Sequence, residues 1–470
     1  MKRPIRHDGE PDSNRLREAA FLNEPRSLRT YTPTLAVLAR SAGIYHWTPE
    51  GKRLFDFTSG VLVANLGHNP TRWTESFREY LGWAGVGVGG VTDRPVPDGF
   101  FSGLPFTAYN AATPLEIEAN ERLLAALRSR PGGGRMEQVM WAASGSEAVQ
   151  KALWAALAQD RGRPLILATR YGFHGKKGMS NAVTGSEADA ERDSRVKFIR
   201  FPMEECRDVA NRGDAFDAAP FEAELKSLLA EHGRKIGALI TEPYLGGGGS
   251  YHPPKAYLQM LQRFCRGHGI VFILDEVQAN FGRTGDLFAY ETYGLEPDLV
   301  VLGKGLGNGV PVAAVAGRRD VFGALEFGEG SDTWSANPLS CAAVLATLDE
   351  FENRDILGPA RETSAVIEAE LVELKRFPFV KHVRGEHGGM VWGVEFADWA
   401  DATASEWANR FVLDSYLGTG GTGDGVHLLG PLAKKVVRIA PPLVTTVPEA
   451  RTALALLHAS AERLMGKAAP

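Results

Sequence analysis

The sequence is poor in cysteine and shows no clustered histidines. Its three cysteines, Cys206, Cys265 and Cys341, lie far apart, and no two of them have CxxC spacing. Disulfide frameworks and structural zinc sites usually depend on such clusters. We therefore expect no disulfide framework and no bound metal, and a reducing cytoplasm is the location that fits this cysteine content.

Long apolar runs and an excess of one charge are also absent. No segment approaches the roughly 20 apolar residues that cross a bilayer. The basic N-terminus is not followed by an apolar run, so no secretory signal is predicted. The 52 Lys and Arg residues nearly balance 57 Asp and Glu residues, for a formal net charge of -5. This balance favours neither nucleic acid nor a membrane surface as a partner, and a small molecule is the expected one.

The chain has 470 residues, of which 44% are hydrophobic. This length predicts two or three packed units. After about residue 66, short apolar runs such as GIVFILDE and PDLVVLGK alternate with helical patterns such as LEIEANERLLAALRSR. The alternation predicts an α/β fold with a mainly parallel central sheet and helices on both faces. Ligands of such sheets bind where the strands end.

Three regions are predicted along the chain. Residues 1–65 form an N-terminal arm and strands that join a smaller domain, residues 66–335 form the large domain, and residues 336–470 form the C-terminal part of a smaller α+β domain. The polar residues 1–30 are expected to be a flexible arm that orders only against other surfaces. Apolar and polar residues between 44 and 57 predict two short strands around a turn.

Two glycine-rich stretches, residues 85–90 and 418–425, predict mobile surface loops. The first belongs to a longer connection, residues 83–103. This connection is interpreted either as a lid over a site or as a surface insertion.

Lys304 follows an apolar strand and has a glycine on each side, Gly303 and Gly305. Such glycines let backbone and ligand approach closely. Neither GxxxxGK[ST] nor GxGxxG spacing occurs here, so a P-loop and a dinucleotide site are not expected. Taken alone, the lysine is as compatible with a solvated charge as with a functional role.

Asp275 ends the apolar run of residues 270–274. An aspartate in this position often only caps the following turn. It also suits a cofactor with a pyridinium nitrogen, because the carboxylate keeps the ring protonated and able to accept electrons. Lys304 and Asp275 end neighbouring strands about one βαβ unit apart, and together they indicate a site more strongly than either alone.

The segment Ser144-Gly145-Ser146 follows a strand and opens a helix. Free N–H groups at a helix N-terminus bind anions such as phosphate. The same residues are compatible with an ordinary N-cap made by Ser144 or Ser146.

Together these motifs resemble the class III aminotransferases, which are pyridoxal-phosphate enzymes of fold type I. The resemblance runs from about Tyr31 to the last helix. Its motifs are SGSEA, YGFHG, TEP followed by a glycine loop, LDEVQ with FGRTG, GKGLGNGVP, TWSANP and RIAPPL. It implies a fold type I transferase with a central sheet of the seven-stranded type and pyridoxal 5'-phosphate as cofactor.

The resemblance also implies residue roles. Lys304 carries the cofactor as a Schiff base, the internal aldimine, and later moves the proton, while Asp275 pairs with the pyridine nitrogen. Phe173 and Val277 cover the two ring faces, and Gln278 reaches the ring hydroxyl. The implied cofactor-binding residues are Ser144, Gly145, Ser146, Phe173, His174, Glu242, Asp275, Val277, Gln278, Lys304 and Thr333.

Thr333 matches a threonine that reaches the phosphate of a neighbouring subunit. The match implies a homodimer, or a dimer of dimers, with shared active sites.

Arg438 resembles the arginine that binds a substrate carboxylate. Tyr31 and Val61 are the other substrate-binding residues that the resemblance implies, and the apolar segment around Val61 indicates a less polar substrate tail. Family members acting on ornithine or 4-aminobutyrate carry a second glutamate after Glu-Pro, which masks the arginine. Here Gly247 occupies that position, which weakens both of those substrate assignments.

The implied reaction transfers an amino group from an amino acid or amine to a 2-oxo acid through pyridoxamine phosphate. An amino-acid racemase or epimerase on the same scaffold is the alternative, since the same groups serve both reactions. A non-catalytic homologue is less favoured because Lys304 and Asp275 are both present. A nicotinamide dehydrogenase is less favoured because the glycine fingerprint is missing.

Overall fold

The computed structural model describes residues 3–83, 99–189, 192–418 and 423–468. Its main sheet has seven strands in the order β4-β10-β9-β8-β7-β5-β6. These strands are β4 (Gln138–Ala142), β5 (Leu165–Thr169), β6 (Val196–Ile199), β7 (Ile236–Thr241), β8 (Val271–Asp275), β9 (Leu299–Leu302) and β10 (Ala313–Gly317). Every pair from β9 to β6 is parallel, and β10 runs antiparallel to β4 and β9. The predicted mainly parallel sheet of seven strands is confirmed.

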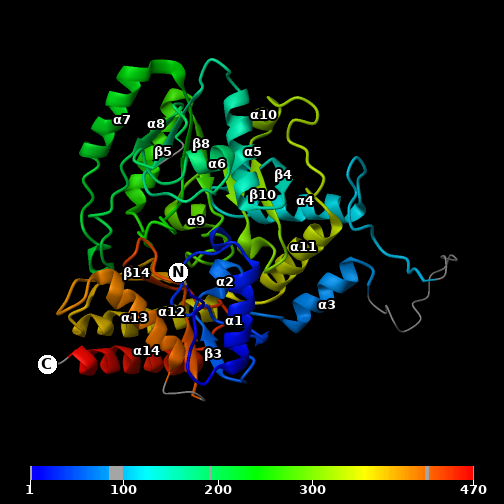
Figure 1. Ribbon diagram of the computed structural model, residues 1–470. Helices are drawn as coiled ribbons and strands as arrows, with labels where there is room; N and C mark the ends of the chain where they lie inside the picture. Colours follow the sequence, from blue (N-terminus) through cyan, green and yellow to red (C-terminus); the bar gives the residue numbers. More distant parts are fainter. Residues whose placement is uncertain (1–2, 84–98, 190–191, 419–422, 469–470) are drawn as a thin grey trace.

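Helices cover both faces of this sheet, as expected (Figure 1). Successive side chains of a strand point to opposite faces. Accordingly, Phe272 of β8 belongs to the apolar cluster that includes α4 (Pro114–Arg128) and α8 (Lys255–His268), whereas Ile273 belongs to the cluster with α5 (Gly145–Ala158). The strands therefore need apolar residues on both faces, which is why they read as nearly continuous apolar runs.

Two smaller sheets and three long helices form the lower half of the molecule in Figure 1. One sheet joins β1 (Arg40–Ala42), β2 (Tyr45–Trp47), β3 (Arg53–Asp56) and β13 (Gly425–His427), and the other joins β11 (Val380–Gly385), β12 (Trp392–Phe396) and β14 (Val436–Ile439). The helices are α12 (Leu357–Glu373), α13 (Ala404–Leu417) and α14 (Val447–Ala468). The expected strands between residues 44 and 57 are β2 and β3, which pair antiparallel. The N-terminal β3 pairs in parallel with the C-terminal β13.

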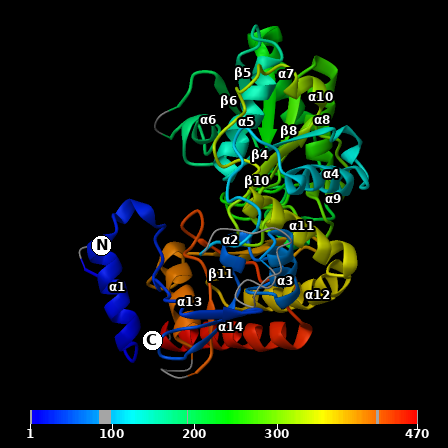
Figure 2. The ribbon, with the colours of Figure 1, turned by 90° about the vertical axis from the view of Figure 1, so that its right-hand side faces the viewer.

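Helices α3 (Thr71–Tyr80) and α11 (Pro338–Asn353) pack against each other between the two halves (Figures 1 and 2). The remaining helices are short or peripheral: α2 (Ser59–Leu62), α6 (Gly178–Ala182), α7 (Ala219–His232), α9 (Ala289–Tyr293) and α10 (Arg319–Phe322). The domain boundaries at 65/66 and 335/336 stay predictions.

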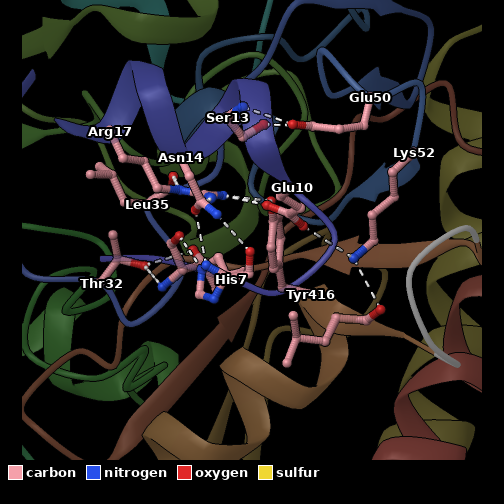
Figure 3. Close-up of polar contacts among 12 residues, drawn as sticks. His7, Glu10, Ser13, Asn14, Arg17, Thr32, Leu35, Glu50, Lys52 and Tyr416 are labelled. Atoms are coloured by element: carbon pink, nitrogen blue, oxygen red, sulfur yellow. Dashed lines mark hydrogen bonds and ion pairs between the residues drawn. The ribbon is translucent and has the colours of Figure 1, made fainter. Parts of the chain in front are cut away.

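The N-terminal arm contains a docked helix, α1 (Pro11–Asn23), where the sequence suggested flexibility. Figure 3 shows the polar contacts that hold it. Arg17 donates from Nη2 to Glu10 (2.7 Å) and to the hydroxyl of Tyr416 (2.9 Å), and all three side chains are buried. Lys52 donates to the carbonyl of Leu417 (3.0 Å) and lies 3.7 Å from Glu10. The arm is therefore ordered against α13, which carries Tyr416, and the connection between β2 and β3, which carries Lys52; α1 stands on the side of α13 in Figure 2.

Part of the loop predictions falls on residues that the structure does not describe. Residues 84–98, which include glycines 85–90, lie outside the described residues, as do residues 419–422 of the second glycine-rich stretch. The lid interpretation of residues 83–103 therefore stays a prediction. In the part of the chain that is described, no helix combines the length and apolar character that a membrane span needs.

Candidate active site

The structure brings Lys304 and Asp275 to the same edge of the main sheet. Asp275 is the last residue of β8, and Lys304 follows β9 by two residues. The two strands are adjacent and parallel, with Asp275 opposite Val301. Carboxyl ends of neighbouring parallel strands form the usual ligand site of open α/β sheets. The two residues singled out by sequence therefore share one site.

Lys304 begins a single 3-10 turn and has a backbone φ of +48°. A non-glycine residue in this region is uncommon and indicates a position that the surroundings impose. The next residue, Gly305, has no room for a side chain, because a Cβ there would lie 2.4 Å from Nδ2 of Asn65. The turn presses against that asparagine and cannot carry a side chain next to the lysine.

The electrostatic surroundings make Lys304 a weaker base than an exposed lysine. Burial, followed by the positive charge of Arg438, lowers the pKa of Lys304 to about 8, while Asp275 and Glu242 oppose the shift. An amine with a pKa near neutrality is suited to exchanging protons and to forming covalent bonds with carbonyl groups.

Asp275 is held in place by two donors. His174 donates from Nδ1 to Oδ2 at 2.7 Å, and the backbone N–H of Val277 donates to Oδ1 at 3.0 Å. Asp275 and His174 are both 3% exposed. Among the described residues, Nε2 of His174 has no hydrogen-bond partner, although it is buried. This nitrogen is on the side of the ring away from Asp275 and lies close to Gly172, where an added Cβ would be 2.8 Å from it.

Glu242 links three segments of the site. It accepts hydrogen bonds from Phe173 N (2.9 Å), Gln278 Nε2 (2.7 Å) and Gly246 N (3.3 Å). Burial is the main cause that raises its pKa to about 7. The carboxylate thus fixes the YGFHG, TEP and LDEVQ motifs relative to one another.

Helix α5 points its N-terminus at the site. Ser144 is the N-cap, and it forms a capping box with Glu147. Gly145 packs against Val277, since a Cβ at 145 would lie 3.1 Å from Cγ1 of that valine. Oγ of Ser146 lies next to Gly175 of the YGFHG segment. The N-cap interpretation of Ser144 is therefore confirmed, and the free N–H groups of Gly145 and Ser146 remain as anion donors.

Arg438 lies in β14 and is 2% exposed. Its Nη2 donates to the carbonyl of Gly246 at 2.6 Å, while its buried Nε has no partner among the described residues. Its positive charge helps to lower the pKa of Lys304, after burial. Gly247 lies beside Phe173, because a Cβ at 247 would be 2.9 Å from Cβ of that phenylalanine.

Val61 belongs to a short left-handed turn, α2. Ser59, Gly60, Val61 and Leu62 have φ values of 49°, 57°, 68° and 64°. Positive φ at a β-branched residue is a backbone outlier and is frequent near functional sites. Ser59 Oγ donates to the carbonyl of Ala440 at 2.7 Å, two residues from Arg438. The turn is therefore tied to the arginine-bearing segment, and Val61 is 41% exposed.

Tyr31 and Thr333 lie at the surface. Tyr31 is 57% exposed and lines a cavity of about 590 Å³ beside α1, together with Arg17 and Phe21. Thr333 is exposed, and its carbonyl accepts from Thr107 Oγ1 at 3.1 Å. Their assigned roles stay predictions.

Sequence reasoning flagged the FGRTG motif but missed the part that Arg283 plays. Its buried side chain donates to Asn65 Oδ1 (2.9 Å) and to the carbonyls of Met390 (3.0 Å) and Pro441 (2.6 Å). Burial lowers its pKa to about 10. Arg283 therefore joins Asn65, which contacts Gly305, to the segment that follows Arg438. The motif itself was the only available signal.

The fold and the paired lysine and aspartate define a pyridoxal-phosphate-dependent transferase of fold type I. A family model described as aminotransferase class-III matches residues 103–460, and the chain belongs to that family. It is therefore an aminotransferase that uses pyridoxal 5'-phosphate.

Relatives and solved structures agree with this assignment. The chain is 27% identical over 445 residues to the acetylornithine aminotransferase of Oceanobacillus iheyensis, covering 93% of this chain and 96% of that protein. It is 30% identical to the 2-aminoadipate transaminase of Pseudomonas putida, covering 84% and 88%. A PLP-bound amine transaminase from an uncultivated Pseudomonas species matches with a TM-score of 0.75 at 26% identity, covering 94% and 96%. All three are described as transaminases, so the racemase alternative gains no support.

The residues present fit this cofactor. Three groups lie at one edge of the main sheet. They are the amine of Lys304, whose pKa is lowered, the buried carboxylate of Asp275, which accepts from His174, and the N-terminus of α5, which begins at Gly145. They match the carbonyl, the pyridine nitrogen and the phosphate of pyridoxal phosphate.

Proposed function

We propose that this aminotransferase takes the amino group from donors with an α-carboxylate, with Arg438 binding that carboxylate, and passes it to a 2-oxo acid. The observation that supports this proposal is the combination of a buried Arg438, whose Nε has no partner among the described residues, with a glycine at position 247. Without a glutamate at 247, no side chain at this position competes with the substrate for the guanidinium.

The site residues have the following proposed roles. When bound, pyridoxal phosphate supplies an electron-withdrawing ring that stabilises negative charge at the substrate α-carbon. Lys304 holds the cofactor and, as a neutral amine, removes the α-proton. Asp275, oriented by His174, carries the negative charge that keeps the ring nitrogen protonated.

Further side chains position the two ligands. Phe173 and Val277 cover the ring faces, and Gln278 reaches the ring hydroxyl once it turns from Glu242, to which it is now bonded. Gly145 and Ser146 donate to the phosphate from the N-terminus of α5. Tyr31 and Val61 contact the substrate tail.

Thr333 is proposed to serve the phosphate of a neighbouring subunit in a homodimer or a dimer of dimers. Exposed Phe106 and Trp334 support this, since they adjoin in sequence the hydrogen-bonded Thr107 and Thr333. A surface that exposes large apolar side chains suits burial by a second copy. We also propose a cytoplasmic location, because the three cysteines are buried free thiols, the state that a reducing compartment maintains.

A half-reaction tests the function. Purified protein with its bound cofactor is mixed with α-amino acids, ω-amino acids or simple amines, without any 2-oxo acid, and the visible absorbance of the cofactor is followed. Loss of that absorbance is expected with α-amino acids, followed by recovery when a 2-oxo acid is added. Persistent absorbance together with exchange of the α-proton for deuterium would contradict amino transfer.

Substitutions at Arg438 and Gly247 test the donor class. We expect Arg438→Gln to lower kcat/KM for α-amino acids about 10- to 100-fold relative to amines without a carboxylate, since it removes charged hydrogen bonds. Gly247→Glu should produce the same discrimination by neutralising Arg438. Gly247→Gln is the control, because it places a side chain of the same size beside Phe173 but adds no charge, and it should lower both donor classes alike. Equal effects of Gly247→Glu and Gly247→Gln would contradict the proposal.

A further inference from the structure

Three histidines that are far apart in the sequence meet near one buried aspartate. His46 lies in β2, His68 lies in the connection before α3, and His427 ends β13. Asp56, at the end of β3, is completely buried. Its Oδ2 lies 2.7 Å from Nε2 of His68 and 3.5 Å from Nε2 of His46. The ligand atoms of His46, Asp56 and His68 all lie within 4.8 Å of one another.

The outer sides of two of these side chains are already engaged. Oδ1 of Asp56 accepts from the backbone N (2.8 Å) and the Oγ1 (2.6 Å) of Thr58, which leaves Oδ2 for the two imidazoles. Nδ1 of His46 is hydrogen-bonded to Oγ of Ser41 at 2.7 Å. Outer contacts of this kind orient metal ligands and fix the tautomer of a ligating histidine. Both Nε2 atoms therefore lie near Oδ2, with no other bond required of either nitrogen on its outer side.

Two imidazoles face the same carboxylate oxygen. Oδ2 of Asp56 is bonded to Nε2 of His68 at 2.7 Å, and Nε2 of His46 lies at the longer distance of 3.5 Å. A third ring, His427, packs edge-on against His46 with 5.6 Å between centroids, and its buried Nδ1 has no partner in the described part of the chain. The two imidazoles of His46 and His68 and the carboxylate of Asp56 form a donor set that zinc and similar ions prefer.

We propose that His46, Asp56 and His68 bind a divalent transition-metal ion such as Zn²⁺. A water fills the remaining position beside His427. In a tetrahedral site the ligand atoms are about 3.3 Å apart, so the distance between His46 and Asp56 is already suitable, and the contact between His68 and Asp56 opens slightly. His68 has 17% of its side chain exposed and offers the entry path for the ion.

This metal site lies next to the substrate side of the active site. Thr58, which holds Asp56, also caps the left-handed turn by accepting from Gly60 N at 3.0 Å. That turn carries Val61. A bound ion would restrain Asp56 and Thr58, and through them the strained turn.

Metal binding is tested directly on tag-free protein that carries its cofactor and has been treated with a chelator. Co²⁺ alone and Zn²⁺ alone are the probes. We expect one Co²⁺ per chain, with d–d absorption of a tetrahedral N/O site, displacement by Zn²⁺ and a rise in Tm with either ion. His46→Gln and His68→Gln should each weaken binding about 100-fold or more, because loss of a ligand exceeds the effect of an outer contact.

His382→Gln is the matched control. His382 faces Asp208 at 3.3 Å in an ordinary aspartate–histidine pair, and Lys375 donates to the same carboxylate. Its replacement should leave the affinity for Co²⁺ and the Tm shift unchanged. Ser41→Ala, which keeps all three ligands, should weaken binding less than His46→Gln does. The proposal would be overturned if the wild type did not bind one Co²⁺ per chain. It would also be overturned if the variant carrying both His46→Gln and His68→Gln bound Co²⁺ as tightly as the wild type.

Discussion

Lys304 is a buried amine close to charges of both signs. Burial and, after it, Arg438 favour its neutral form, whereas Asp275 and Glu242 favour the charged form, and the pKa is lowered overall. The outcome, a pKa near 8, means that the neutral fraction grows as the pH rises through 8. A lysine in water, with a pKa of about 10.4, would be almost fully protonated over the same range.

The first residue-scale prediction concerns pH. We expect the single-turnover rate with a simple amine donor to rise with pH and to level off above about 8, because the neutral Lys304 accepts the proton. Arg438→Gln removes a positive charge and should move this limb to higher pH. A simple amine is used so that loss of carboxylate binding does not interfere. Stopped-flow absorbance between pH 6.5 and 9.5 measures it, and a limb unmoved by the substitution would contradict the assigned charge interaction.

Lys304→Ala is the accompanying control. It should retain the fold and reduce turnover to background, because Lys304 is the lysine of the GKGLGNGVP motif and the amine to which the proton transfer is assigned. Full turnover in Lys304→Ala would sink the central assignment.

At the scale of elements, α1 is an arm whose buried side chains, Ser13 and Arg17, are both polar. Arg17 has a fully buried side chain and contacts Glu10 and Tyr416, the latter almost 400 residues away. The apolar surface of the arm is modest: Leu16, Phe21 and Leu22 are all exposed. The docking of α1 thus depends on polar contacts more than on apolar burial.

We predict that Arg17→Gln detaches α1. Removing one partner of a buried pair leaves Glu10 without its main counter-charge, which typically costs about 3–5 kcal/mol. The helix should then become sensitive to protease and exchange its amides faster, while the remaining chain keeps its cofactor absorbance. Arg15→Gln is the control on the same helix, since Arg15 is exposed and its ion pair with Asp12 is long, at 3.8 Å. Equal protection of α1 in both variants would show that the buried pair does not hold it.

The whole molecule presents the question of assembly. Thr333 lies on the surface, and the role proposed for it at the phosphate of a neighbouring subunit requires a second chain to cover it. Trp334 and Phe106 beside it are 61% and 64% exposed. Isologous dimers bury such a patch on both subunits at once.

Complementation between two inactive variants tests this assembly. Lys304→Ala lacks the catalytic amine, and Thr333→Glu should repel the phosphate of the neighbouring site. Neither homodimer should be active. In a mixed dimer one site receives both defects and the other none, so random assembly after co-expression should restore about a quarter of wild-type activity. No recovery from a purified mixed dimer would exclude shared sites.

Much of the site was open to prediction because its residues stand at strand ends. Asp275 and Lys304 each come at the end of an apolar run, which is a local sequence pattern. Parallel pairing of the two strands then places both residues at one edge of the sheet. The cap at Ser144 follows from a local capping box. By contrast, the role of Arg283 depends on carbonyls of Met390 and Pro441, and no local pattern indicates such partners.

The sequence by itself determined the α/β alternation, the mainly parallel sheet and the family, because apolar periodicity and short motifs act over a few residues. Only the tertiary structure decided the docking of α1, the left-handed turn at Val61, and the meeting of His46, His68 and His427 around Asp56. Each of these joins segments distant along the chain or a backbone state that the residue type disfavours. The free energy that these arrangements cost is offset by packing across the whole fold, and a short stretch of sequence does not show that packing.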